Sequence, residues 1–139
     1  MHETFKHQAD VGVRGRGKTL EDAFEGAAKA MFSVMVELQE VNPEIEVKFA
    51  AVGEDRESLL INFLNELLFQ IDVNHMLFSE FGVKSIEKKN GEFYLKGSAK
   101  GEKISERHNI RTGVKAASYS QVFVGEKDGE FVAQCIVDV

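Results

Sequence analysis

The 139-residue sequence has little cysteine, little proline and no apolar run long enough to cross a bilayer. Cys135 is the only cysteine, so a disulfide within the chain and zinc sites built on CxxC pairs are excluded. The first residues lack the basic-then-apolar order of a signal peptide, and a transmembrane helix needs about 20 apolar residues. We therefore expect a soluble protein of a reducing compartment, the cytoplasm, with no membrane partner.

Basic side chains are also in deficit. The chain has 17 Lys and Arg against 23 Asp and Glu, a formal charge of −6, whereas a free-standing nucleic-acid binder normally carries a basic footprint. The balance is uneven, because residues 1–80 hold seven basic and fifteen acidic side chains and residues 81–139 hold ten and eight. The basic stretch from Lys84 to Lys115 predicts either a solvated sheet face or a patch that meets a partner.

Two amphipathic helices are expected. Thr19 can cap the first, whose apolar stripe continues until Asn42-Pro43 is expected to end it. Asp55 can cap the second, which is predicted to run from Arg56 to about Val73. Because each helix has one apolar stripe, each is expected to lie on a sheet.

Strands account for most of the remaining sequence. Residues 45–51 alternate apolar and polar side chains, as does much of the chain after Leu77. Asn90-Gly91 and Asp128-Gly129 are typical of two-residue hairpin turns. The order strand, helix, strand, helix and then about four strands predicts the α+β class. We expect a single domain, residues 1–139, with two helices on one face of a largely antiparallel or mixed β-sheet.

The second hairpin also makes a prediction about the C-terminus. A two-residue turn at Asp128-Gly129 sets the register, and counting along both strands places Asp138 opposite Tyr119 and Val139 opposite Ser118. The last residues are then held in a sheet.

Asp138 is the most informative residue for chemistry. It shares a strand face with apolar side chains, and the α-carboxylate of Val139 lies one residue away. Two such carboxylates repel unless a proton or cation lies between them, and oxygen ligands suit calcium, magnesium or manganese. The alternative is a frayed strand end at which Asp138 faces water.

Three further residues are candidates for the same site. Asp10, just before a short alternating run, is either a turn residue or a ligand. His7 is a ligand, a proton carrier or a core histidine with its hydrogen bonds satisfied. Lys115 leads into the strand opposite the C-terminus, where it could neutralise carboxylates, contact a phosphate or face solvent. No nucleophile-and-base pair stands out, and Cys135 is expected to be a buried, inert thiol.

The sequence resembles the archease family, the small proteins that assist the RtcB-type tRNA-splicing ligase. The resemblance covers nearly the whole chain and depends on the order and spacing of its matching segments. These are residues 7–12, 17–24, 64–69, 78–81, 106–108, 114–116 and 136–139.

The resemblance implies a non-catalytic accessory protein. Archeases promote guanylylation of the ligase, allow its multiple turnover and broaden its use of nucleotide triphosphates. The implied partner is the ligase, with tRNA met only through it, and the free protein is expected to be a monomer. The alternatives are a stand-alone metal-dependent phosphoester hydrolase and a general chaperone or adaptor.

The resemblance also implies site residues. The family's divalent metal site falls on Asp10, Asp138 and Val139, with calcium, magnesium or manganese as the ion, and its important lysine falls on Lys115. His7 belongs to the same segment as Asp10 and is expected to contact the partner or a phosphate. Many members have threonine where this chain has Gln8, and many prokaryotic members have histidine where it has Ser120.

Overall fold

The computed structural model describes residues 1–7 and 9–139. Gln8, where this chain differs from the common threonine, therefore lies outside the described residues. The described chain forms seven strands, two α-helices and one 3₁₀ helix. In chain order they are β1 (His2–His7), β2 (Asp10–Gly17), α1 (Leu20–Met35), η1 (Leu38–Glu40), β3 (Ile45–Gly53), α2 (Arg56–Asn74), β4 (Met76–Lys89), β5 (Glu92–Lys103), β6 (Ala116–Lys127) and β7 (Glu130–Asp138). None of its helices is both long enough and apolar enough to span a membrane.

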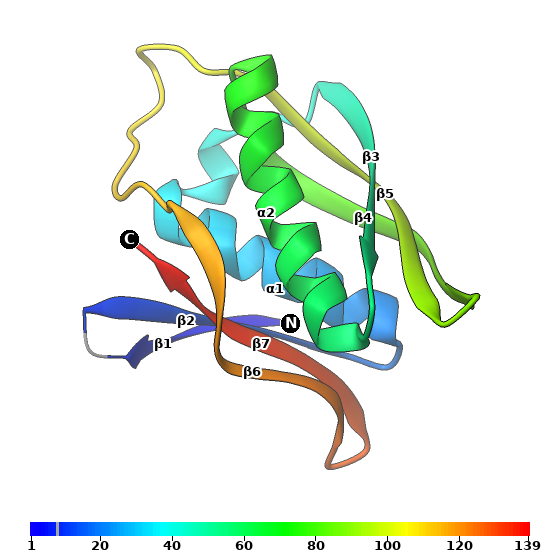
Figure 1. The fold of residues 1–139 in the computed structure, drawn as a ribbon. Coiled ribbons are helices and arrows are strands. Elements are labelled where there is room, and N and C mark those ends of the chain that lie inside the picture. Colours follow the sequence, from blue (N-terminus) through cyan, green and yellow to red (C-terminus); the bar gives the residue numbers. More distant parts are fainter. Residues whose placement is uncertain (8) are drawn as a thin grey trace.

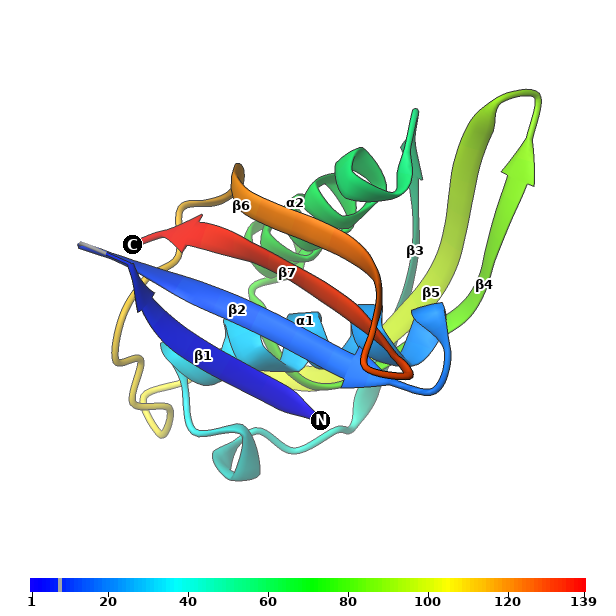
Figure 2. The same ribbon diagram turned by 90° about the horizontal axis from the view of Figure 1, so that it is seen from below.

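The strands form two sheets, and the helices lie between them (Figures 1 and 2). The larger sheet has the order β1-β2-β7-β6 and the smaller one β3-β5-β4, with every described pair antiparallel. The α+β class is confirmed, but the expected single sheet covered on one face is wrong. Both helices contact both sheets, because each is apolar on more than one side.

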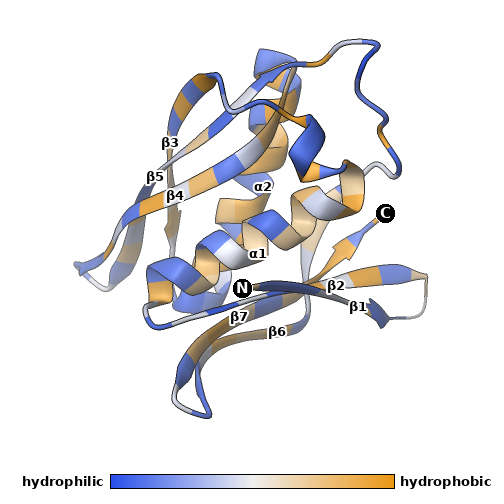
Figure 3. Cartoon of the chain, turned by 180° about the vertical axis from the view of Figure 1, so that it is seen from behind, coloured by the Kyte–Doolittle hydropathy of each residue, from blue (hydrophilic) through white to orange (hydrophobic). Residues whose placement is uncertain are grey.

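The close packing of α1 on β2 depends on glycines. A Cβ on Gly15 would lie 2.0 Å from the carbonyl oxygen of Ala23, and one on Gly26 would lie 2.8 Å from the Cα of Gly15. Backbone therefore meets backbone at this point. On its other side α1 packs through Phe32, whose ring centroid is 4.9 Å from that of Phe81 in β4. Figure 3 shows hydrophobic residues along both helices, and many of them belong to the buried core between the sheets.

The helix starts are confirmed, but the first helix ends early. Thr19 Oγ1 accepts the Asp22 N–H at 3.0 Å, and Asp55 begins a reciprocal capping box with Ser58. The α1 helix ends at Met35, well before the expected stop at Asn42-Pro43. The chain leaves the helix there because Val36 and Val41 bury their side chains against Leu77 in a second small core.

Both predicted hairpin turns are confirmed, and Asp128 and Gly129 have φ of 54° and 83°. The predicted register of β6 and β7 holds from the turn as far as Phe123 and Gln134, but it shifts between Ser118 and Phe123. Asp138 therefore faces Ala116, and the predicted pairing of Asp138 with Tyr119 is wrong.

The predicted pairing of Val139 with Ser118 is also wrong, because Ser118 faces Ile136. Gln121 lies within the irregular stretch with a φ of 50°, and its carbonyl accepts a hydrogen bond from Gln134 Nε2 at 3.1 Å. The extra residues of β6 are accommodated in this bulge.

Candidate functional site

The two aspartates predicted as ligands come together at one end of the larger sheet. His7 faces Asp10 across β1 and β2, and Ala116 faces Asp138 across β6 and β7. Val11 pairs with Val137, so one step further along the same antiparallel register Asp10 lies opposite Asp138. Side chains directly opposite on an antiparallel pair have Cβ atoms roughly 5 Å apart.

The row formed by His7, Asp10, Asp138 and Ala116 lies on the outer face of the sheet. Val137 is fully buried in the central core, and successive side chains of a strand point to opposite faces. Asp10 and Asp138, the neighbours of Val11 and Val137, therefore project away from the helices, and both are half-buried.

Val139 lies beside the two aspartates. The backbone N–H of Val139 donates to Asp10 Oδ1 at 3.4 Å, so the terminal residue lies against the Asp10 carboxylate. In Figures 1 and 2 the C-terminus lies beside the same end of β2. Two side-chain carboxylates thus meet where β2 begins and β7 ends, with Val139 against one of them. Such a group is self-repelling without a counter-charge.

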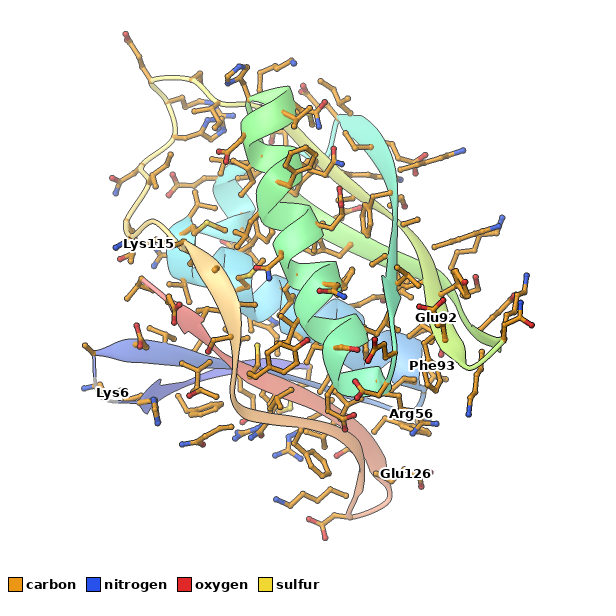
Figure 4. All side chains as sticks on the ribbon, viewed as in Figure 1. Lys6, Arg56, Glu92, Phe93, Lys115 and Glu126 are labelled. Atoms are coloured by element: carbon orange, nitrogen blue, oxygen red, sulfur yellow. The ribbon has the colours of Figure 1, made fainter. Side chains whose placement is uncertain are left out.

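Lys115 lies beside this acidic group. Its backbone N–H donates to the carbonyl oxygen of Asp138 at 2.8 Å, and its side chain is exposed. Figure 4 shows Lys115 where the loop between β5 and β6, residues 104–115, enters β6. The predicted proximity of Lys115 to Asp138 is confirmed, and the ammonium is a compact positive charge on a flexible stem.

His7 differs from a core histidine with satisfied hydrogen bonds. Its Nδ1 atom is buried and has no hydrogen-bond partner among the described residues. A buried polar atom without a partner is rare in folded proteins and calls for a ligand or water. His7 lies opposite Asp10 in the outer row, so it is the histidine of this end of the sheet.

The donor set fits a hard divalent cation. Asp10 and Asp138 supply carboxylate oxygens, the ligands that calcium, magnesium and manganese prefer. Among the described residues no three His, Cys, Asp or Glu side chains are grouped closely enough to hold a metal on their own. The fit therefore depends on the α-carboxylate of Val139 as the third acidic group.

The loop that carries Lys115 is held by residues to which the sequence assigned no role. Glu102 accepts the Asn42 N–H at 2.8 Å and contacts His108 Nε2 at 2.9 Å, and it also pairs with Arg107. These three hydrogen bonds lower the pKa of Glu102 to about 2. The His108 side chain is fully buried, and its Nδ1 accepts the Ser105 N–H at 3.0 Å.

Two backbone contacts complete the placement of this loop. The Arg111 N–H donates to the carbonyl of Met35 at 2.7 Å, and Asn65 Oδ1 in α2 accepts the Ala117 N–H at 2.8 Å. The cluster around Glu102 and these two bonds fasten the segment at both ends. No local sequence pattern predicts these contacts, since the partners come from distant elements.

Cys135 plays no part in the site. It is fully buried in β7, and burial raises the pKa of its thiol to about 12. The predicted burial is confirmed, and the raised pKa keeps the thiolate scarce.

Fold and site together define a small α+β protein with two sheets, two central helices and a carboxylate cluster at one strand end. A model of the Archease protein family (MTH1598/TM1083) matches residues 2–139. Protein archease of Pyrococcus furiosus is 42% identical over 139 residues, covering 99% of this chain and 97% of its own. Protein archease of Sulfolobus acidocaldarius is 39% identical over 138 residues, with coverage of 99% and 97%. The chain belongs to the archease family.

Solved structures agree. The solution structure of Methanobacterium thermoautotrophicum protein 1598 matches with a TM-score of 0.84 at 37% identity, covering 99% of this chain and 98% of its own. The crystal structure described as an archease, possible chaperone, from Thermotoga maritima matches at 0.53 and 14% identity, covering 100% and 98%. The latter shows the shared fold.

Proposed function

We propose that this protein activates an RtcB-type tRNA-splicing ligase by promoting guanylylation of the ligase, and that it has no catalytic activity of its own. On this proposal it also permits multiple turnover and broader use of nucleotide triphosphates. The observation that carries it is the convergence of Asp10, Asp138 and Val139 at one end of the larger sheet, next to Lys115.

In this proposal the carboxylates of Asp10, Asp138 and Val139 hold a divalent cation: calcium, magnesium or manganese. The bound ion would supply positive charge near a nucleotide phosphate, and phosphoryl transfer depends strongly on such charge neutralisation and on positioning. His7 lies in the same row and would complete the site or contact the partner.

The location of Lys115 supports the same proposed function. Its exposed ammonium is carried on a segment fastened to Met35 and Asp138, so it can reach outward from a defined base. We propose that it contacts a phosphate or a carboxylate of the ligase. The tRNA is then met only through the ligase.

The test is guanylylation of the cognate ligase at catalytic ratios of this protein. Asp10→Asn and Asp138→Asn keep the side-chain shape and remove one charge each, and both are expected to abolish most of the stimulation. Asp128→Asn, an exposed turn residue at the opposite end of the hairpin, is the matched control and should stimulate like the parent. Full stimulation by both site variants would refute the metal-dependent proposal.

Two other activities give different results in parallel assays. A phosphoester hydrolase predicts metal-dependent turnover of a nucleotide or phosphoester by the isolated protein. A general chaperone predicts suppression of aggregation of unrelated clients, without metal. The proposal predicts no turnover by the isolated protein and no suppression of aggregation. It predicts stimulation of the ligase alone.

A further inference from the structure

The outer face of the smaller sheet carries a second feature that the carboxylate site does not use. A groove of about 630 Å³ lies across strands β3, β5 and β4. Ala50 and Ser98 face outward there, and Gly97 lies in its floor, so this part of the sheet lacks large outward side chains. The groove exists because bulky residues are missing from the centre of the face.

Three lysines surround the groove, one from each strand of the sheet. They are Lys48 of β3, Lys96 of β5 and Lys84 of β4, and all three are exposed. Within the described part of the chain, none of them has a carboxylate oxygen within 4.0 Å, since the ion pairs involve other residues. Three exposed ammonium groups without an ion-pair partner among the described residues favour an anionic ligand.

The register shows how these charges are arranged. Lys48 lies opposite Ser98, which in turn lies opposite Gly82, while Lys96 lies opposite Ala50. Lys84 falls at the irregularity of β4 between Val83 and Ser85, where the strand departs from regular pairing. The hydroxyl of Ser98 is thus placed between the lysines as an uncharged donor.

Glutamates limit the basic area at one end. Glu46 lines the groove itself, and in the adjoining row it lies opposite Lys100, which lies opposite Glu80. A smaller hollow of about 220 Å³ continues into this mixed row. A long polyanion such as an RNA backbone would run past the lysines onto these carboxylates. A short anionic ligand would not.

The groove also has an apolar component. Ala50 and the aliphatic stems of the lysines provide it, while the ring of Phe49 points the other way and packs on Phe63 in the core. A ligand with carboxylates and aliphatic side chains would match both parts, whereas a bare phosphate would leave the apolar lining without a partner.

We propose that this groove binds a short acidic segment of a protein partner, in which carboxylates alternate with aliphatic residues. The site is separate from the carboxylate cluster, since the two lie on different sheets with the helices between them (Figure 2). The protein can therefore hold a partner through the lysines while the Asp10 end stays free.

The test is fluorescence polarisation with a labelled hexapeptide of alternating glutamate and leucine, at low salt. The parent is expected to bind it, and the combined variant Lys48→Gln, Lys84→Gln, Lys96→Gln should bind about tenfold more weakly, since each exposed ion pair contributes modestly and three are removed together. The affinity should also fall as salt rises.

The matched control is Lys18→Gln, Lys29→Gln, Lys127→Gln. It removes the same three charges from exposed positions outside the groove, and we expect less than a twofold change in affinity. A glutamine-leucine hexapeptide should not bind the parent. Amide signals of Gly97 and Ser98 should shift on titration with the acidic peptide.

Equal binding by the groove variant and the parent would overturn the proposal, and so would absence of any peptide binding. Polyuridine RNA that binds the parent more tightly than the peptide, and loses affinity with the groove variant, would assign the groove to nucleic acid instead. Each result is independent of ligase guanylylation, which the groove variant can be tested for separately.

Discussion

Replacement of Asp138 by asparagine is expected to change stability in opposite directions with and without calcium. The register of β2 and β7 places Asp138 opposite Asp10. The Val139 N–H donates a hydrogen bond to Asp10 Oδ1 at 3.4 Å. Without a cation, removing one negative charge relieves repulsion. With a bound cation, the same change removes a ligand.

The magnitude in the metal-free state follows from the spacing. Two unit charges about 5 Å apart interact by about 0.8 kcal/mol in water and about 3 kcal/mol at an effective dielectric of 20. Both aspartates are half-buried on an outer face, so we expect Asp138→Asn to stabilise the metal-free protein by about 0.5–1 kcal/mol.

The calcium-bound state reverses the sign. A ligand at about 100 times its dissociation constant stabilises the folded state by about 2.7 kcal/mol, and the variant should lose most of that increment. The assay is urea unfolding followed by circular dichroism, in chelator and in excess calcium. The Asp128→Asn control should behave like the parent in both. A variant that is destabilised equally in the two conditions would refute the carboxylate cluster as a cation site.

Three other predictions concern the fold around the site. Gly15→Ala should lower the free energy of unfolding by about 3 kcal/mol or more in urea titration, because its Cβ would lie 2.0 Å from a helix carbonyl, whereas Gly113→Ala, with nothing within 4 Å, should change it by less than about 0.5 kcal/mol. The hydrogen bonds that lower the pKa of Glu102 from 4.5 to about 2 stabilise the folded state above the unfolded pKa, and this contribution is lost as the pH falls from about 4.5 to 2. Glu102→Gln should therefore lose less stability than the parent over that interval in acid unfolding monitored by circular dichroism, and a steeper loss would contradict the assignment. Cys135 should react with a thiol reagent only in denaturant, and rapid reaction of the native protein would show that β7 opens readily.

The features predictable from sequence are those whose cause lies within a few residues. The Asp55 cap depends on Ser58 three positions on, and the Asp128-Gly129 turn depends on two residues that accept positive φ. Helix α2 was therefore predicted to within one residue at its end. The end of α1 was missed because its cause is Leu77, a residue far along the chain.

The candidate site was predicted residue by residue but not in its geometry. The matching family segments named Asp10, Asp138, Val139 and Lys115, yet the register that pairs Asp138 with Ala116 depends on the bulge in β6. Nothing local marks that bulge, because Gln121 is not a residue typical of positive φ.

The sequence alone determined the helix starts, the two-residue turns, the α+β class and the set of residues that carry charge. Tertiary structure decided that the strands form two sheets, that the N-terminal strand β1 joins the larger one, and that Asp10 and Asp138 meet. The physical reason is that caps and turns are satisfied by neighbours in the chain. The pairing of β2 with β7 joins residues 114 to 126 positions apart, and the packing of a whole core against α1 selects it.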